Sequence, residues 1–210
     1  MATYQALQQK IADDLNRSDL TTQIQAAILA AVELHEAERF WFNELRQTSA
    51  FTTVQGQEFY TSADSALIAS MKQLDAVTIT VSGNRYPLTK RTYGLLEALS
   101  STTTSRGQPC DYAIYGEGLR LWPIPDGAYA VALSGLRQFT ALSGDTDENP
   151  WTTEAFELIR AQAKEDLNLN VLKDDAEATR ASVQVAKQLK RLREETSRRL
   201  ATSTLRPTQF

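Results

Sequence analysis

The spacing of apolar residues changes twice along this chain, and this limits the folds open to it more than any other feature. Residues 3–16 and the stretch after residue 150 repeat apolar side chains at the helical period, whereas residues 51–139 are rich in β-branched and aromatic side chains. Helical ends around a β-rich middle predict an α+β fold. Each helical end has an apolar stripe to bury, so we expect the N- and C-terminal helices to pack as a helical bundle, with an inserted small antiparallel β domain and an extended C-terminal tail.

Breaks in these patterns predict the boundaries of the parts. We expect N-terminal helices over 1–48, the β domain over 49–142, C-terminal helices over 143–200 and a flexible tail over 201–210. The expected helices lie at 3–16, about 20–43, 93–99, from Trp151 onward, and from about 174 to 200 after a break at 168–175. The expected strands form hairpins at 74–89 and 111–122, and a further strand lies at 128–139.

The stretch 116–127, GEGLRLWPIPDG, places two prolines where a strand should continue. Proline has no N–H to donate to a strand ladder, and in sheets it is confined to edges, strand ends and bulges. We therefore expect Pro123 and Pro125 to end the Leu119–Trp122 strand at an edge of the sheet. Asp126-Gly127 should then turn the chain into the next strand.

Composition excludes several classes of protein. The chain has 210 residues, a formal net charge of −4 and 42% hydrophobic residues, which suits one globular domain or two small ones. The mild acidity argues against a surface dedicated to coating nucleic acid, which needs a local excess of Lys and Arg. The most apolar run, 24–34, is far short of the roughly 20 residues that span a bilayer. A single cysteine, Cys110, and the lack of a signal-like start predict a protein kept in a reducing cytoplasm.

Residue types that carry catalysis or bind metals are sparse. His35 is the only histidine and lies on the apolar side of its helix, so we expect a packing role. The run Asp145-Thr-Asp-Glu-Asn149 begins like a calcium loop, but Pro150 stands where that loop needs glycine, and Phe156 where it needs glutamate. Glu58 and Glu117 are the carboxylates beside aromatic or turn positions. We expect no catalytic residue, no cofactor and no metal.

The C-terminal region departs from the overall acidity. Seven cations outweigh Glu194 and Glu195 there: Lys187, Lys190, Arg191, Arg193, Arg198, Arg199 and Arg206. One interpretation is a solvated helix whose basic end is favoured by the helix dipole. The other is a docking surface for an acidic partner or for passing DNA, with the tail folding on contact.

The run 106–129, RGQPCDYAIYGEGLRLWPIPDGAY, resembles the core of the tailed-bacteriophage head-to-tail adaptor (connector, neck or head-completion) proteins. The aromatic end of the N-terminal helical region, the tryptophan that opens a helix after an acidic loop, and the basic closing helix agree with this family. The positions that carry the resemblance are Gly107, Pro109, Tyr112, Gly116, Leu119, Leu121, Pro123, Pro125 and Trp151.

The resemblance implies a structural protein and not an enzyme. It implies a homo-oligomeric ring, a dodecamer in the virion neck, that sits beneath the portal protein ring and continues the channel through which DNA passes without specific binding. The helical part would face the portal and the β part the next tail or nozzle component, with assembly in the host bacterial cytoplasm and no membrane contact. The residues expected to dock on the portal are Arg198, Arg199, Leu205, Arg206, Pro207 and Phe210.

Two other functions remain open from the sequence. A virion-associated cell-wall hydrolase would use Glu58 or Glu117 as its carboxylate. A nonspecific DNA-binding module would use the basic last helix, and its affinity would fall steeply with salt.

Overall fold

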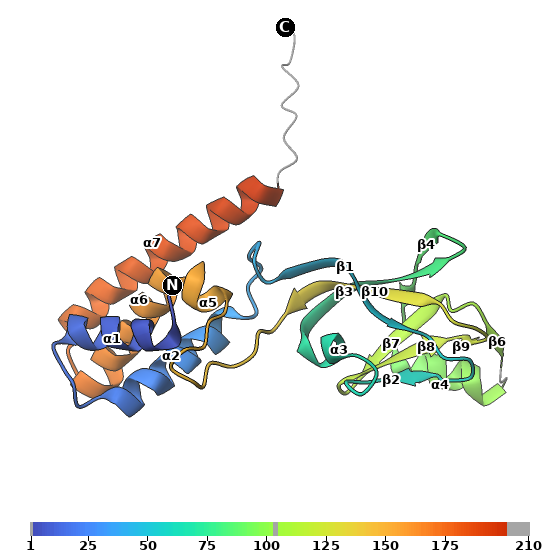
Figure 1. Ribbon diagram of the computed structural model, residues 1–210, viewed down its shortest axis with the longest axis horizontal. Coiled ribbons are helices and arrows are strands. Elements are labelled where there is room, and N and C mark those ends of the chain that lie inside the picture. The colour runs from blue at the N-terminus through green and yellow to red at the C-terminus, as the bar shows by residue number, and fades with distance from the viewer. Residues whose placement is uncertain (1, 103–104, 201–210) are drawn as a thin grey trace, which may run out of the picture. The chain divides into compact units, whose positions relative to one another are not determined.

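The chain divides into two compact units, shown in the computed structural model of Figure 1. The helical unit comprises residues 1–43 and 139–210, and the β unit comprises residues 44–138. The structure describes residues 2–102 and 105–200. The expected tail at 201–210 lies outside these described residues.

The helical unit brings both ends of the chain into one core. Helix α6 contacts α1, α2 and α7, and the buried side chains of all four helices form a single apolar cluster. No helix in the described part of the chain is long and apolar enough to cross a membrane. The elements of this unit are α1 (Tyr4–Leu15), α2 (Thr21–His35), α5 (Pro150–Thr153), α6 (Phe156–Asp166), the π-helix η1 (Leu167–Leu172) and α7 (Asp175–Leu200).

The expected helix over 20–43 is too long, because α2 ends at His35 and the chain then turns. The Asn43 side chain holds this turn: it accepts a hydrogen bond from the Phe40 N–H at 2.9 Å and donates one to the Glu38 carbonyl at 2.8 Å. The turn sets the rings of Phe40 and Phe42 against Trp151, with centroids 6.0 and 5.1 Å away. Aromatic packing therefore overrides the helical pattern here.

The expected break at 168–175 is narrower in the structure. Helix α6 runs directly into η1, and the chain leaves helical geometry at Lys173, whose φ of 58° is left-handed. Leu167 and Asn168 are buried, so packing against the core holds this stretch helical.

The β unit is built from two four-stranded sheets and a two-stranded one. The first sheet has the order β1-β10-β3-β4, the second β2-β8-β7-β5, and β6 pairs with β9. The strands are β1 (Glu44–Thr52), β2 (Phe59–Tyr60), β3 (Met71–Val81), β4 (Asn84–Pro87), β5 (Thr89–Lys90), β6 (Arg106–Gly107), β7 (Asp111–Tyr115), β8 (Gly118–Trp122), β9 (Ile124–Pro125) and β10 (Ala130–Arg137). Two short helices, α3 (Ala66–Ser70) and α4 (Tyr93–Thr102), complete the unit.

The two larger sheets share one core, as in a β-sandwich. Val77 and Leu133 from the first sheet and Tyr112 and Leu121 from the second belong to the same buried cluster. Both expected hairpins are confirmed by the antiparallel pairing of β3 with β4 and of β7 with β8. At the β3–β4 turn, Ser82 and Gly83 both have positive φ, the geometry of a two-residue hairpin loop.

Two strand expectations were wrong. The strand β1 begins at Glu44, ahead of the change of period that the sequence shows at Phe51. The strand β8 does end at Trp122, before Pro123, but it lies between β2 and β7 and so is an interior strand, not an edge. Its second neighbour comes from Phe59–Tyr60, which is distant in sequence, and Pro125 pairs with Gly107 in the parallel β6–β9 ladder.

Helix α4 covers the outer face of the second sheet, where Arg120 is fully buried. The guanidinium lies between the rings of Phe59 and Tyr93, 5.2 and 5.1 Å from their centroids. It donates to Glu58 and Glu97, both at 2.5 Å. Burial opposes the charge, but these hydrogen bonds outweigh it and raise the pKa of Arg120 above its ordinary value. Arg120 therefore fastens α4 and β2 to β8.

Replacing Arg120 with Gln should lower the free energy of unfolding of the β unit by about 3 kcal/mol, because it leaves Glu58 unpaired and removes both ring contacts. Urea denaturation read by hydrogen exchange in β7 and β8 measures this. The control is Arg91→Gln, which removes an exposed pair with Asp111 and should cost less than about 1 kcal/mol. Equal losses in the two variants would contradict the role given to Arg120.

His35 should make the stability of the helical unit depend on pH. Burial lowers the pKa of His35, and the hydrogen bond to Gln162 and the nearby Glu38 offset this only in part. The unfolded chain takes up a proton near pH 6.5 and the folded chain does so only at lower pH. The free energy of unfolding should therefore fall as the pH drops below about 6.5, by at most about 1.4 kcal/mol per pH unit.

The measurement is the Tm between pH 8 and 5 for the natural chain and for His35→Gln. Because His35 is the only histidine, the variant should lose most of the decline near pH 6. Identical profiles for the two proteins would show that His35 does not cause it.

Candidate docking surface

Helix α7 has two contrasting sides. It is 26 residues long, about 39 Å. One side packs on α6 and η1 through side chains at helical spacing: Ala178, Ala181, Val185, Leu189, Leu192 and Thr196. The opposite side faces solvent, and α7 is therefore the natural place to look for a partner-binding surface.

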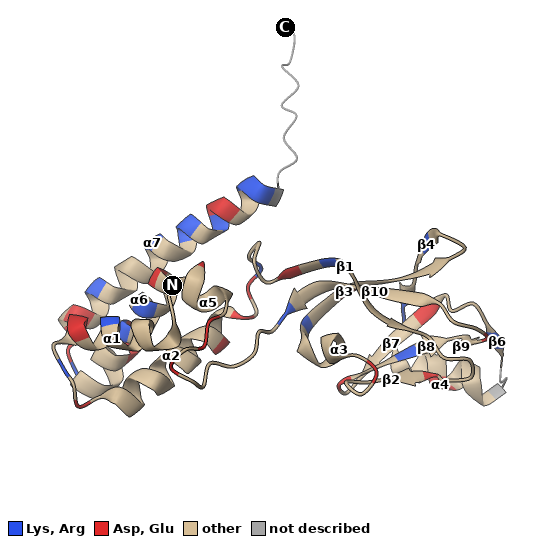
Figure 2. Cartoon of the chain, viewed as in Figure 1, with Lys and Arg blue, Asp and Glu red and all other residues tan. Residues whose placement is uncertain are grey.

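Helix α7 is basic along its second half, as the blue segments in Figure 2 show, and its solvent side carries most of these cations. We call five exposed side chains on this side the basic stripe: Arg180, Lys187, Lys190, Arg191 and Arg198. Arg180 pairs with Glu177, Arg198 with Glu195, and Lys190 lies 3.9 Å from Glu194. Lys187 and Arg191 have no carboxylate partner within residues 2–102 and 105–200, so part of the stripe is not neutralised within the chain.

The last turns of α7 are fastened to the turn after α2. The Arg199 guanidinium lies over the Trp41 ring, 4.4 Å from its centroid. The Trp41 N–H donates to the Thr196 hydroxyl at 3.4 Å, and Arg193 pairs with Glu38. These contacts hold the end of α7 in a fixed direction.

The structure separates the residues that we expected to dock on the portal. Arg198 is 75% exposed, whereas Arg199 packs on Trp41 and also donates to Glu195 at 2.6 Å. Both arginines share Glu195, and the hydrogen bond from Arg199, together with the charge of both arginines, lowers the pKa of that carboxyl group below its ordinary value. Leu205, Arg206, Pro207 and Phe210 lie outside the described residues.

The positions that carry the family resemblance are structural in this fold. Tyr112, Leu119 and Leu121 are buried between the sheets, and Trp151 is buried in the helical core. Pro109 and Pro125 are also buried, Pro123 follows the end of β8, and Gly107 lies in β6. Gly116 opens the β7–β8 turn with φ at 58°, a conformation that glycine adopts without strain. Most of the shared pattern therefore lies in the β unit, where its buried members build the core, and Trp151 lies in the core of the helical unit.

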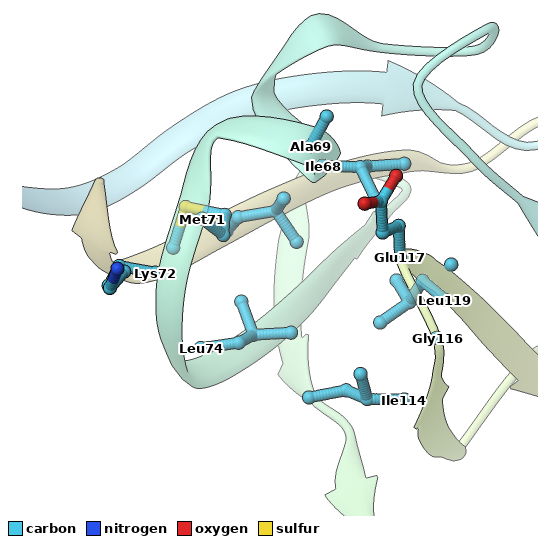
Figure 3. Close-up of a pocket in the computed structure, with 11 residues that line it drawn as sticks. Ile68, Ala69, Met71, Lys72, Leu74, Ile114, Gly116, Glu117 and Leu119 are labelled. Atoms are coloured by element: carbon cyan, nitrogen blue, oxygen red, sulfur yellow. The ribbon is translucent and has the colours of Figure 1, made fainter. Parts of the chain in front are cut away.

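A cleft of about 250 Å³ lies between α3, β3 and the β7–β8 hairpin (Figure 3). Ile68, Met71 and Leu74 line one side, and Ile114 and Leu119 line the other. Glu117 is the one carboxylate in the lining. A glycoside hydrolase ordinarily sets a pair of carboxylates about 5–9.5 Å apart across its substrate.

Glu58, the other carboxylate considered for hydrolysis, is not in this cleft. It lies beside β2, and Arg120 binds its carboxylate on the outer face of the second sheet. The two glutamates therefore do not meet in one site, and the chemistry expected of a hydrolase is not assembled by them.

The acidic loop 143–149 holds the ends of two helices. The Tyr4 and Gln5 N–H groups at the start of α1 donate to the carbonyls of Asp147 and Asp145, at 2.9 and 3.0 Å. The Asp147 carboxylate accepts the N–H groups of Ser143 and Gly144, which lowers its pKa below the ordinary value. Asn149 caps α5 by accepting from the Trp151 N–H at 2.9 Å.

His35 lies in the helical core with 6% of its surface exposed. This placement agrees with the expected packing role. Within the described residues its Nε2 has no hydrogen-bond partner, and a buried neutral imidazole is the form that burial favours.

Two sets of contacts were not foreseen from the sequence. The Arg120 cluster joins residues from β2, α4 and β8, and the contact of Trp41 with Arg199 joins residues from opposite ends of the chain. Neither pair has a local spacing that would reveal it. The one signal in the sequence was that the chain has both an aromatic run, at 40–42, and a basic last helix.

Replacing Trp41 with Leu should loosen the end of α7, since it keeps apolar bulk but removes the ring beneath Arg199. We expect amide exchange in residues 193–199 to rise about fivefold to tenfold, with α1 unchanged. Hydrogen exchange read by mass spectrometry measures this. Arg191→Gln is the control and should leave exchange in these turns as it was. An unchanged rate in Trp41→Leu would show that the contact does not hold the helix end.

Comparison with known proteins gives one result. No curated protein matches the chain. A family model described as "SU10 adaptor protein" matches residues 2–208, which span both units. The match confirms the resemblance to phage head-to-tail adaptors, and it agrees with a structural role. The chain belongs to the SU10 adaptor protein family.

Proposed function

We propose that this chain is the head-to-tail adaptor of a tailed bacteriophage. Copies form a ring, a dodecamer, beneath the portal, join the DNA-filled capsid to the tail and continue the DNA channel. The observation that carries the proposal is membership of the adaptor family over residues 2–208. The site of action is the virion neck, after assembly in the host cytoplasm.

The division into two units supports a role between two partners. Each unit has a separate apolar core, so each can present its own surface to one neighbour. We place the portal on the helical unit and the next tail or nozzle component on the β unit.

The end of α7 is the proposed portal contact. Arg198 is exposed, and the contact of Arg199 with Trp41 fixes the direction in which the chain leaves the helix. Residues 201–210 add Leu205, Arg206, Pro207 and Phe210, which combine apolar anchors with a further cation. Aromatic and arginine side chains supply much of the binding energy at protein interfaces, and Phe210 and Arg206 are of these kinds.

The overall charge suits a channel for DNA. A net charge of −4 repels phosphates at long range, so DNA passes without being gripped. The basic stripe would bind DNA if it faced the channel, and we therefore place it away from the passing duplex.

The test is binding to the portal ring from the same source, measured by native mass spectrometry of the mixture. The natural chain should join the portal in a fixed ring-like ratio. Deleting residues 201–210 should weaken binding at least about a hundredfold, because two or three interface anchors are lost. The Tm of the deleted chain should stay the same.

A matched control is Arg85→Glu, a change of charge in the β unit, which should leave portal binding intact. A natural chain that never binds the portal would reject the proposal. If the deletion unfolds the chain, the tail is needed for folding rather than for docking. Arg198→Glu then tests the contact without shortening the chain.

A further inference from the structure

Charge is separated within the helical unit and balanced within the β unit. Residues 187–199 hold six Lys or Arg and two Glu, whereas residues 2–43 and 139–186 hold sixteen Asp or Glu and seven Lys or Arg. The β unit has eight of each sign. A basic helix half therefore lies on an acidic body, as Figure 2 shows for this unit.

The middle of the basic stripe is available to another molecule. Lys187, Lys190 and Arg191 lie one turn apart on the side of α7 opposite its buried residues, and all three are exposed. In the described chain, neither Lys187 nor Arg191 meets a carboxylate, and the contact of Lys190 with Glu194 is long, at 3.9 Å. Three close cations repel one another, so carboxylates from outside would stabilise this surface.

An acidic surface of the same chain matches it. Residues 139–159 contain Asp145, Asp147, Glu148, Glu154 and Glu157 and no Lys or Arg. Glu148 and Glu154 are exposed, and their carboxylates make no hydrogen bond or ion pair within the described residues. Hydrogen bonds to α1 and the Asn149 cap hold the loop that carries Glu148, and Glu154 directly follows α5, the helix that this cap begins. These two carboxylates are therefore presented from a fixed backbone.

We infer that the middle of α7 binds the 145–157 segment of a second copy of this chain. A closed ring of identical copies needs two different surfaces that fit each other, one on each side of every copy. A basic and an acidic surface on one chain meet this need, which is why charge complementarity points to a second copy. The inference rests on the proposed function and adds the contact that joins neighbours in the ring.

Other partners fit these residues less well. The proposed portal contact lies at the end of α7 and in residues 201–210, which come after Lys187 and Arg191 in the chain. DNA would meet the same cations, but the acidic body beside them would repel its phosphates. Both partners are outcomes that the test separates.

Two charge-reversed variants test the contact. The first, Lys187→Glu with Arg191→Glu, sets carboxylates against the acidic segment of the neighbour. The second, Glu148→Lys with Glu154→Lys, sets cations against the basic stripe. Each variant alone should self-associate more weakly than the natural chain. In an equal mixture, alternating copies restore opposite charges at every contact, so self-association should return.

Self-association is measured by sedimentation at about 50 and 500 mM salt, alone and on the portal ring. Each variant should weaken it at least about tenfold, and the mixture should recover to within about threefold of the natural chain. High salt should weaken the self-association of the natural chain. The inference is overturned if the mixture self-associates no more strongly than each variant alone. It is also overturned if the natural chain stays monomeric even with the portal. Loss of DNA binding in the first variant with self-association unchanged overturns it as well.

Cross-linking locates the contact independently. With Cys110 replaced by Ser, Arg191→Cys and Glu154→Cys copies should link through a short bifunctional maleimide when mixed, and Arg85→Cys copies should not link to either. Absent links reject the contact. If portal binding fails but self-association recovers in the mixture, the proposed function is rejected and the contact between copies is retained.

Discussion

The helical unit depends on the packing of Trp151 against the aromatic residues that follow α2. The chain leaves this unit after Asn43 and returns at Phe139, so contacts between its two halves must close the core across the inserted β unit. Trp151 is 1% exposed, and the rings of Phe40 and Phe42 meet it edge to face. Its indole N–H is buried without a partner within the described residues, so the ring itself is held by apolar packing.

That packing also sets the direction of α7. The turn that delivers Phe40 and Phe42 to the core leaves Trp41 on its other side, where the ring supports Arg199. One short aromatic run thus closes the core and fixes the last turns of the long helix. A partner at the end of α7 meets a helix whose direction is already set, so less entropy is lost on binding.

Local patterns predicted most of the helices and hairpins. The spacing of Tyr4, Leu7 and Ile11 indicated α1, and β-branched alternation around Val77 indicated β3. The patterns failed where contacts between residues distant in sequence determine the local structure. Pro123 suggested an edge strand, but β2 comes from far upstream to cover β8. Helix α2 ends at His35, earlier than expected, because the rings of Phe40 and Phe42 are stabilised more by burial than by helical geometry.

The docking residues show the same limit. Composition identified a basic C-terminal region but not which side chains remain available to a partner. Arg199 is occupied by Trp41 and Glu195, whereas Lys187 and Arg191 stay unpaired within the described chain. Only the fold reveals this difference, since it depends on which side of α7 is buried.

The charge pattern agrees with copies that are free before assembly and then join in the proposed ring. Net charge acts at long range and keeps free copies apart, whereas the basic stripe and the acidic segment attract only when they come within a Debye length, about 8–10 Å. Random encounters between two acidic bodies are therefore repulsive, and one orientation is favoured. Because the β unit has equal numbers of acidic and basic residues, its net charge adds little to this selection.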